Sequence, residues 1–336
     1  MANRDTAPSV NAMTYFTYHA SQEQFTPSDL LGLVQQAEAA GFDGAFTSDH
    51  AHPWSETQGQ SGFAWSWLGA ALARTSRLTF GAISVPGGWR YNPAVLAQAV
   101  STLGQMFPGR LPWIALGSGQ FLNEHITGED WPDKSTRNAR LREGAEIMRA
   151  LLAGETVTHR GLVTSTDAKI WSRPDVPTRL MGAAVTPETA GWLGGWADGL
   201  LTVNADLAKL EAIIDAFRAG GGEGKPIHVK VDIAWAPTLE EARREAHEQW
   251  RFNALGGAVN WDIRTPADFD IATRFVRPDD MDNSVLIVSD PAELADWIAA
   301  RLALGVETVN LHNVGCNQAG FIDMAGEALL PALRAA

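Results

Sequence analysis

Short apolar runs alternate along the chain with longer segments in which apolar residues recur every three to four positions. The short runs are typical of buried strands, and the longer segments are typical of helices that pack on them. In the segment 26–41 the apolar residues follow helical spacing, and Gly41 ends the predicted helix. The eight predicted strands are residues 13–18, 42–47, 78–85, 113–116, 180–184, 199–203, 227–235 and 308–312.

Strands that alternate with helices form a parallel sheet, and eight is the number that closes a barrel. We therefore predict a single-domain α/β fold over residues 1–336, a (β/α)8 TIM barrel with insertions. Residues 157–164 alternate about a glycine and predict a hairpin outside the barrel. Residues 256–283 mix aromatic and charged side chains and predict an insertion that covers the site. A doubly wound sheet is the alternative, but the strands lack the Gly-rich turn of a dinucleotide site.

The net charge of the chain limits the kinds of ligand that it can bind. The net charge is −13, from 26 Lys and Arg against 39 Asp and Glu, which argues against nucleic acid as a ligand. The one cysteine excludes an intrachain disulfide. The chain has no apolar signal core at its start and no apolar run that could span a bilayer. We expect a cytoplasmic protein without a membrane partner.

Candidate chemistry gathers after the second predicted strand, in Ser48-Asp49-His50-Ala51-His52-Pro53-Trp54. Loops that follow the strands of a barrel converge over its C-terminal face, where active sites lie. A neutral imidazole supported by a carboxylate is a suitable general base. Asp49 is the neighbour that could support His50, although consecutive residues of an extended chain point to opposite faces. The alternatives are that Asp49 caps a helix and that one histidine is a buried core residue.

A His-x-His pair also raises the possibility of a metal hydrolase. His50 and His52 would face one way and could bind Zn²⁺. Such a site needs further ligands from other strand ends, and the fifth and sixth strands offer apolar residues there. The sequence therefore predicts no metal.

Residues 182–189 end a strand and open a helix with Pro187 in its first turn. Small residues let a phosphate approach, and the helix N-terminus offers free N–H groups. Thr186 and Thr189 could add hydroxyl donors, while the alternative is that Thr186 is a plain N-cap. Candidate basic residues for an anionic cofactor tail are Arg90, Arg110, Arg137 and Arg140.

Three motifs in this order resemble the F420-dependent glucose-6-phosphate dehydrogenases of the luciferase-like superfamily. They are residues 48–54, Arg90-Tyr91-Asn92-Pro93-Ala94-Val95-Leu96-Ala97-Gln98-Ala99 and Gly117-Ser118-Gly119-Gln120-Phe121-Leu122-Asn123-Glu124. The similarity extends from about Tyr18 to the last predicted helix. It implies a (β/α)8 barrel, a homodimer, and a flavin or the deazaflavin coenzyme F420 held at the strand ends.

The resemblance also implies roles for single residues. His50 matches the proposed active-site base, Trp54 the aromatic residue that stabilises the reacting intermediate, and Glu23 a substrate-side carboxylate. Asp49 matches a residue near the cofactor ring. The turn 83–85 falls where the superfamily often has a non-proline cis peptide, which costs about 3 to 4 kcal/mol. The remaining implied cofactor contacts are Ile83, Ser84, Val85, Gly117, Ser118, Gly119, Ala183, Ala184, Val185, Thr186 and Thr189.

Two departures from the dehydrogenase pattern change the expected chemistry. Gln120 stands at the position of a catalytic glutamate, and an amide cannot exchange a proton near neutral pH. The loop 203–206 lacks the expected lysine, so glucose 6-phosphate is not the expected substrate. Residues 62–68 and 312–315 resemble a sister branch proposed to use FMN.

We therefore expect an oxidoreductase that transfers hydride between a bound ring and a small neutral organic substrate, with His50 as acid/base and Gln120 beside it. FMN is favoured over F420 as the cofactor. The alternatives are an F420-dependent sugar or alcohol dehydrogenase, an FMN-dependent monooxygenase that uses O₂ and a flavin reductase partner, and a flavin-binding module without turnover.

Overall fold

The computed structural model describes residues 14–204 and 206–335 of the chain. Eight parallel strands close into a barrel, because β8 pairs with β9 and the last barrel strand pairs with the first. The predicted TIM barrel is confirmed. Met13, the start of the first predicted strand, lies outside the described residues. The barrel strands are β1 (Tyr15–Ala20), β2 (Gly44–Thr47), β3 (Thr79–Ser84), β4 (Trp113–Leu116), β7 (Arg179–Ala183), β8 (Leu200–Val203), β9 (Ile227–Trp235) and β11 (Thr308–Asn313).

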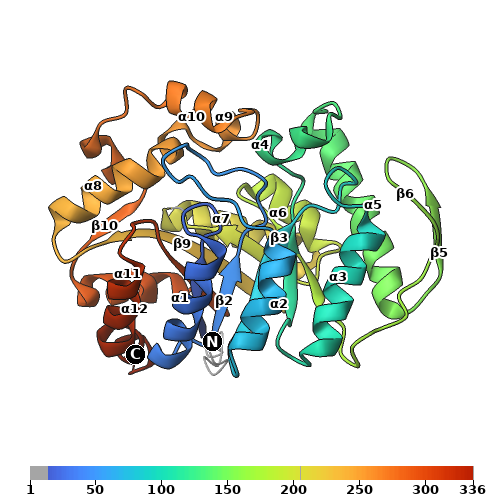
Figure 1. Cartoon of the computed structure of the whole chain (residues 1–336), viewed down its shortest axis with the longest axis horizontal. Helices are drawn as coiled ribbons and strands as arrows, with labels where there is room; N and C mark the ends of the chain where they lie inside the picture. Colours follow the sequence, from blue (N-terminus) through green and yellow to red (C-terminus); the bar gives the residue numbers. More distant parts are fainter. Residues whose placement is uncertain (1–13, 205, 336) are drawn as a thin grey trace, which may run out of the picture.

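Helices surround the barrel (Figure 1). The first one, α1 (Pro27–Ala40), begins at Thr26, whose hydroxyl accepts a hydrogen bond from the Asp29 backbone N–H. It ends as predicted at Gly41, whose φ of 95° is a left-handed conformation that favours glycine. The other long helices are α2 (Ala64–Arg74), α3 (Pro93–Met106), α5 (Lys134–Ala153), α6 (Pro187–Gly194), α7 (Leu207–Phe217), α8 (Leu239–Trp250), α11 (Pro291–Leu302), α12 (Gln318–Met324) and α13 (Leu330–Ala335).

Short helical turns fill several connections. They are α4 (Phe121–Glu124), η1 (His125–Thr127), η2 (Arg218–Gly222), η3 (Arg251–Leu255), α9 (Gly257–Asn260), α10 (Pro266–Ala272), η4 (Pro278–Asn283) and η5 (Ala325–Leu329). Among the described residues, no helix is both long and apolar enough to cross a membrane.

Two strand pairs lie outside the closed barrel. The predicted hairpin is confirmed as β5 (Val157–Arg160) and β6 (Thr164–Ala168), which pair antiparallel and stand apart from the barrel in Figure 1. The sequence pattern did not predict β10 (Leu286–Val288), which pairs with the C-terminal residues 233–235 of β9. A strand of this length carries too few residues to show a periodic signal.

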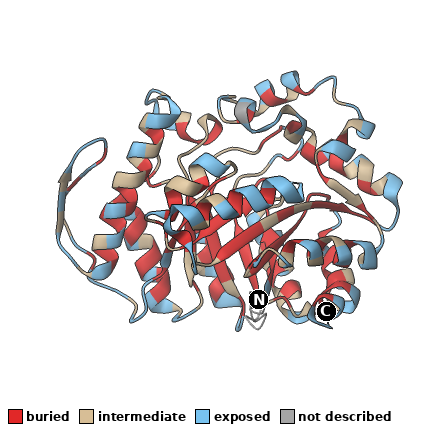
Figure 2. Cartoon of the chain, turned by 180° about the vertical axis from the view of Figure 1, so that it is seen from behind, coloured by how far each residue is buried: buried red, intermediate tan, exposed pale blue. Residues whose placement is uncertain are grey.

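The interior of the barrel is apolar near β2, β4, β7 and β8, and it is polar along β9. Phe46, Ala115, Met181 and Leu201 pack together in the interior. On β9 the residues Val229, Val231 and Ile233 are fully buried in the core cluster that includes the surrounding helices. Because side chains alternate along a strand, His228, Lys230 and Asp232 face the interior instead. Figure 2 shows the strands as the buried centre of the molecule.

The predicted insertion packs on the loops that follow two barrel strands. Trp261 accepts a hydrogen bond through its backbone oxygen from the Phe121 N–H at 3.0 Å. Phe269 contacts the ring of Trp54 edge-on, with 5.4 Å between centroids. Figure 1 places α9, α10 and α4 at the same end of the barrel. The insertion therefore lies beside the mouth that the loops after β2 and β4 surround.

Candidate active site

His50 lies at the barrel mouth with one ring nitrogen against a buried carboxylate. Its Nδ1 is 2.8 Å from Oε1 of Glu23, which belongs to the loop after β1. Ser48 and Ser21 donate hydrogen bonds to the same carboxylate, at 2.5 and 3.0 Å. Burial raises the pKa of Glu23, but His50 and the Ser48 hydroxyl outweigh it and hold this pKa well below its ordinary range. This is the support that an imidazole acting as acid and base requires.

The structure shows the partners of two carboxylates near His50. Glu23 is buried, with a side chain that is 4% exposed, and its carboxylate lies against His50. Asp49 does not support His50, because consecutive residues point to opposite faces. Asp49 accepts hydrogen bonds from the Ser84 hydroxyl and, at 2.8 Å, from the Tyr91 hydroxyl. Glu23 therefore takes the place that the sequence offered to Asp49.

Asp49 belongs to an enclosed ionic cluster, the Asp49–Arg90–Glu124 group. Arg90 Nη1 is 3.3 Å from Asp49 Oδ1, and Arg90 Nε is 3.2 Å from Glu124 Oε1. The side-chain exposures of arginine, aspartate and glutamate are 8%, 1% and 1%. Burial raises the pKa of Glu124, and Arg90 offsets only part of this effect. The group ties together the loops after β2, β3 and β4.

Gln120 supports the loop that carries His50. Its Oε1 accepts a hydrogen bond from Asn123 Nδ2 at 3.0 Å. Asn123 Oδ1 in turn accepts from the backbone N–H groups of Ala51 and His52, at 2.9 and 3.3 Å. The amide at position 120 therefore holds the residues next to His50 through Asn123, a contact that the sequence did not predict.

Aromatic rings form one wall of the mouth. His50 meets Trp54 edge-on at 5.2 Å, and Trp54 stacks on Phe252 at 4.7 Å. Phe252 contacts Trp250 at 4.6 Å, and Trp250 contacts His312 at 4.7 Å. Trp54 thus lies beside His50. The sequence analysis did not identify Trp250 and Phe252 as site residues, because they follow a helix that is distant in sequence from the predicted motif.

The implied cofactor contacts lie at the C-terminal ends of β3, β4 and β7. Ser84 and Ala184 are buried. The expected cis peptide at 83–85 is not present, since the described residues contain none. The chain stays in register there, with Ser84 opposite Leu116 of β4. The half-buried residues, which leave surface open at the strand ends, are Ile83, Val85, Gly117, Ser118, Gly119, Ala183, Val185, Thr186 and Thr189.

The start of α6 combines a capped helix end with a cation. The Thr186 hydroxyl accepts from the Thr189 N–H at 3.3 Å, so the expected N-cap is confirmed. Lys134 Nζ donates to the Thr189 hydroxyl at 3.0 Å. A helix N-terminus with two hydroxyl groups and an ammonium beside it is a favourable place for a phosphate. Lys134 was not predicted, because it comes from a helix far away in sequence.

A second polar group, the Lys230–Asp232–His312 group, lies inside the barrel. Lys230 Nζ donates to Asp232 Oδ1, and His312 Nδ1 is 2.8 Å from that oxygen and 3.2 Å from the ammonium. The rings of His19 and His312 are in contact, with 4.0 Å between their centroids and 37° between their planes. Burial lowers the pKa of both histidines, and Lys230 lowers it further, so both imidazoles are neutral near pH 7. The alternation His-Val-Lys-Val-Asp at 228–232 is the signal in the sequence that could have pointed to this group, but the sequence analysis took these residues only as part of a strand.

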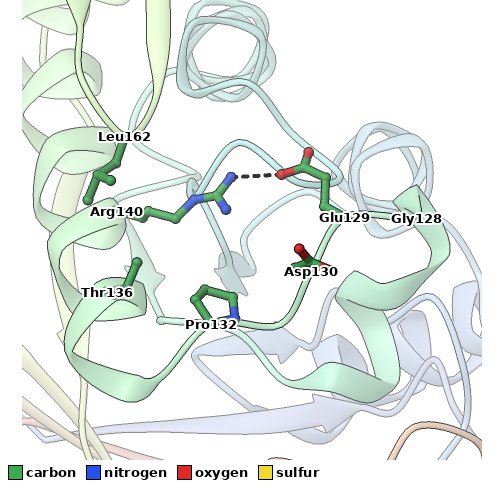
Figure 3. A pocket seen from close by; sticks show the side chains of 7 residues that line it. All are labelled: Gly128, Glu129, Asp130, Pro132, Thr136, Arg140 and Leu162. Atoms are coloured by element: carbon green, nitrogen blue, oxygen red, sulfur yellow. Dashed lines mark hydrogen bonds and ion pairs between the residues drawn. The ribbon is translucent and has the colours of Figure 1, made fainter.

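The four candidate arginines for an anionic tail all have protein partners. Arg90 is enclosed as described, and Arg110 donates to the backbone oxygens of Leu72, Thr75 and Leu78. The guanidinium of Arg137 lies 4.2 Å from the ring centroid of Trp131 and that of Arg140 lies 4.0 Å from that of Trp89. Figure 3 shows Arg140 paired with Glu129 across a surface hollow of about 470 Å³. Of the residues that the sequence analysis proposed for the site, only Arg140 lines this hollow.

His52 does not join His50. Its ring stacks on that of His125, with 5.3 Å between centroids and 16° between planes. Within residues 14–204 and 206–335, no three side chains of His, Cys, Asp or Glu are arranged to hold a metal ion. The two histidines of the motif thus have separate partners.

A barrel with an imidazole–carboxylate pair and an open row of strand ends is typical of enzymes that bind a planar cofactor over the C-terminal face. Comparison with known proteins agrees. Residues 9–308 match the family model described as luciferase-like monooxygenase. The chain therefore belongs to the luciferase-like monooxygenase family, and it is an oxidoreductase.

Similar proteins match this chain over almost its full length. The F420-dependent glucose-6-phosphate dehydrogenase of Beutenbergia cavernae is 34% identical over 327 residues, which cover 95% of this chain and 97% of that protein. The protein of the same name from Mycobacterium tuberculosis is 31% identical and covers 94% and 97%. The solved structure of an F420-dependent secondary alcohol dehydrogenase in complex with an F420–acetone adduct has a TM-score of 0.88 and 29% identity, and the match covers 96% of this chain and 99% of that one.

Proposed function

We propose that this chain is an F420-dependent dehydrogenase or reductase that interconverts an alcohol and a carbonyl compound, with His50 as the acid/base. The observation that carries the proposal is the His50–Glu23 pair at a barrel mouth with open strand ends. The relatives named above support F420, whereas the sequence analysis favoured FMN. A secondary alcohol dehydrogenase among them supports the substrate class.

The residues present fit the coenzyme. The half-buried strand ends around Ile83, Gly117 and Ala183 offer a surface for the ring, and Gly117 has room above it because an added Cβ would meet only Ile83 Cδ1, at 3.9 Å. The start of α6, with Thr186, Thr189 and Lys134, would hold the phosphate. When bound, F420 supplies the acceptor or donor of the hydride.

The protein's own part of the reaction is to move a proton and to exclude water. Nδ1 of His50 lies 2.8 Å from the Glu23 carboxylate, which leaves Nε2 as the nitrogen to take a proton from a substrate hydroxyl or return it to a carbonyl oxygen. The rings of Trp54 and Phe252 form a dry wall beside it. Holding a substrate oxygen against this imidazole is a matter of orientation, which lowers the entropic part of the barrier.

The test is a titration of the purified apoprotein with F420 and, separately, with FMN, followed by quenching of the tryptophan fluorescence. We expect F420 to bind at least tenfold more tightly, and the F420-loaded protein to oxidise a secondary alcohol with loss of the visible absorbance of the coenzyme. Tighter binding of FMN would overturn the choice of cofactor and direct the work to O₂ uptake with a flavin reductase. Tight F420 binding without turnover of any alcohol or carbonyl compound would point to a binding module.

A further inference from the structure

The Lys230–Asp232–His312 group opens into the same mouth as His50. Lys230 and Asp232 each have a side-chain exposure of 16%, while their neighbours Val229 and Val231 are fully buried. Because the outer face of β9 is closed, the exposed part of both polar side chains faces the interior of the barrel.

Contacts connect this group with the His50 site. Gln24, the residue after Glu23, places its Oε1 3.4 Å from Nε2 of His312. The row of rings from Trp54 through Phe252 and Trp250 ends at the same histidine. The row of rings thus connects the His50 site with the neighbourhood of Lys230.

Although this end of the mouth contains a lysine, it carries no excess of positive charge. Lys230 is bonded to Asp232, so its positive charge is compensated, and its ammonium also lies 5.4 Å from the ring centroid of Trp250. His312 and His19 add no charge near neutral pH, because burial lowers the pKa of both. With Glu23 behind His50, the side chains named here carry one net negative charge.

The Trp250 indole is a donor in this region that lacks an acceptor among the described residues. Trp250 is 6% exposed, and its indole N–H has no hydrogen-bond partner among the described residues. A buried donor of this kind costs free energy unless a ligand supplies an oxygen. A neutral hydroxyl or carbonyl group supplies that oxygen without bringing a second negative charge.

We propose that Asp232 is a specificity-determining residue: by neutralising Lys230 it restricts the substrate to uncharged hydroxyl or carbonyl compounds and excludes phosphorylated or carboxylated ones. The inference rests on the proposed function and names the substrate class of the same site. Removing the carboxylate frees the Lys230 ammonium, which then offers an anion a charged donor inside a partly enclosed pocket.

The experiment compares Asp232→Asn with the wild type in the F420-loaded full-length protein, and uses inorganic phosphate as the probe. Phosphate binding is followed through the fluorescence of the tryptophans, of which Trp250 adjoins Lys230. We expect phosphate to bind at least tenfold more tightly to D232N, and the double variant D232N/K230Q to lose the gain. The ratio of kcat/KM for glycerol 3-phosphate to that for glycerol should rise in the same variant.

Asp215→Asn is the matched control. It removes the same charge from the exposed side of α7, where the carboxylate is 66% exposed, and should leave phosphate binding unchanged. An affinity of D232N within twofold of the wild type would overturn the proposal, and so would a gain that survives K230Q. Asp232→Ser provides a second variant if the asparagine protein does not fold.

Lys230→Gln alone keeps the inference falsifiable if neither Asp232 variant folds. The wild-type phosphate affinity should change less than twofold, because Lys230 is already compensated, and a tenfold loss would show that this lysine serves anions. The failure of the proposed function is distinguishable. A wild-type protein that binds neither F420 nor FMN refutes that function, while the gain in D232N and its reversal by K230Q are still measured on the apoprotein.

Discussion

Two groups of a carboxylate and a cation flank His50, and they differ in access to solvent. In the Asp49–Arg90–Glu124 group the side chains are 1%, 8% and 1% exposed. In the Lys230–Asp232–His312 group the lysine and the aspartate are each 16% exposed. The first group lies between three loops and has no surface for a ligand, whereas the second opens into the barrel. The same kinds of charge are thus enclosed between loops in one group and partly open to the barrel interior in the other.

The electrostatic balance of the two groups differs as well. Arg90 is shared by two buried carboxylates, and the pKa of Glu124 is raised by burial despite this partner. Burial also raises the pKa of Asp232, but Lys230 and His312 outweigh it and hold that pKa well below its ordinary range. The enclosed group therefore depends on one cation, while the carboxylate of the open group has two partners.

The largest expected effect comes from removing the cation of the enclosed group. Arg90→Met leaves two buried carboxylates without their partner and should lower the free energy of unfolding by roughly 3–5 kcal/mol. Lys230→Met should cost less, about 1–3 kcal/mol, because water reaches Asp232. Urea denaturation of both variants measures the difference. Equal losses of unfolding free energy in the two variants would show that the difference in solvent exposure does not affect stability.

The next effect concerns the carboxylate between the two groups. Glu23→Gln removes the charge that faces His50 Nδ1 and should lower kcat by at least about tenfold, with little change in KM, because the substrate contacts stay in place. Glu23→Asp should recover part of the rate. Glu56→Gln, an exposed position on the loop after β2, is the matched control. A change confined to KM would instead restore Glu23 as a substrate contact.

A separate effect is the response of three buried histidines in the barrel to pH. Burial lowers the pKa of His19, His228 and His312 below the ordinary value of 6.5, so the unfolded chain binds protons first as the pH falls. Their contribution to stability is complete above about pH 6.5 and is lost below it, at up to about 1.4 kcal/mol per pH unit for each histidine.

Denaturation midpoints at successive pH values from neutral to mildly acidic test this expectation. His228→Gln should reduce the slope by up to a third, because it removes one of the three histidines. A stability that does not change across this range would mean that the pKa of these imidazoles is the same in the folded and the unfolded chain.

Periodicity was sufficient to predict the barrel and the hairpin, because both depend on local patterns of apolar residues, and it placed residues 48–54 at the end of a strand. The partners of the site residues were not predictable in this way. Glu23 reaches His50 only because the loop after β1 folds over the end of β2, and Arg90 meets Glu124 only because β3 and β4 are neighbours. Lys230 and Asp232 can be noticed in the sequence as polar residues in an otherwise apolar strand. Their contact with His312 cannot be predicted in this way, because it depends on β9 lying beside β11.

The closure of the barrel also sets when the site forms as the chain folds. Asn310 donates to the Thr17 hydroxyl across 293 positions of sequence, and the same pair of strands brings His312 onto His19. Contacts between residues so distant in sequence form slowly, because a long loop must close first. During synthesis β1 must wait for β11, the last strand to leave the ribosome, before it gains this neighbour. The polar floor of the mouth is therefore completed in the last step of folding, and a shortened chain that lacks β11 would have the His50 motif but no finished site.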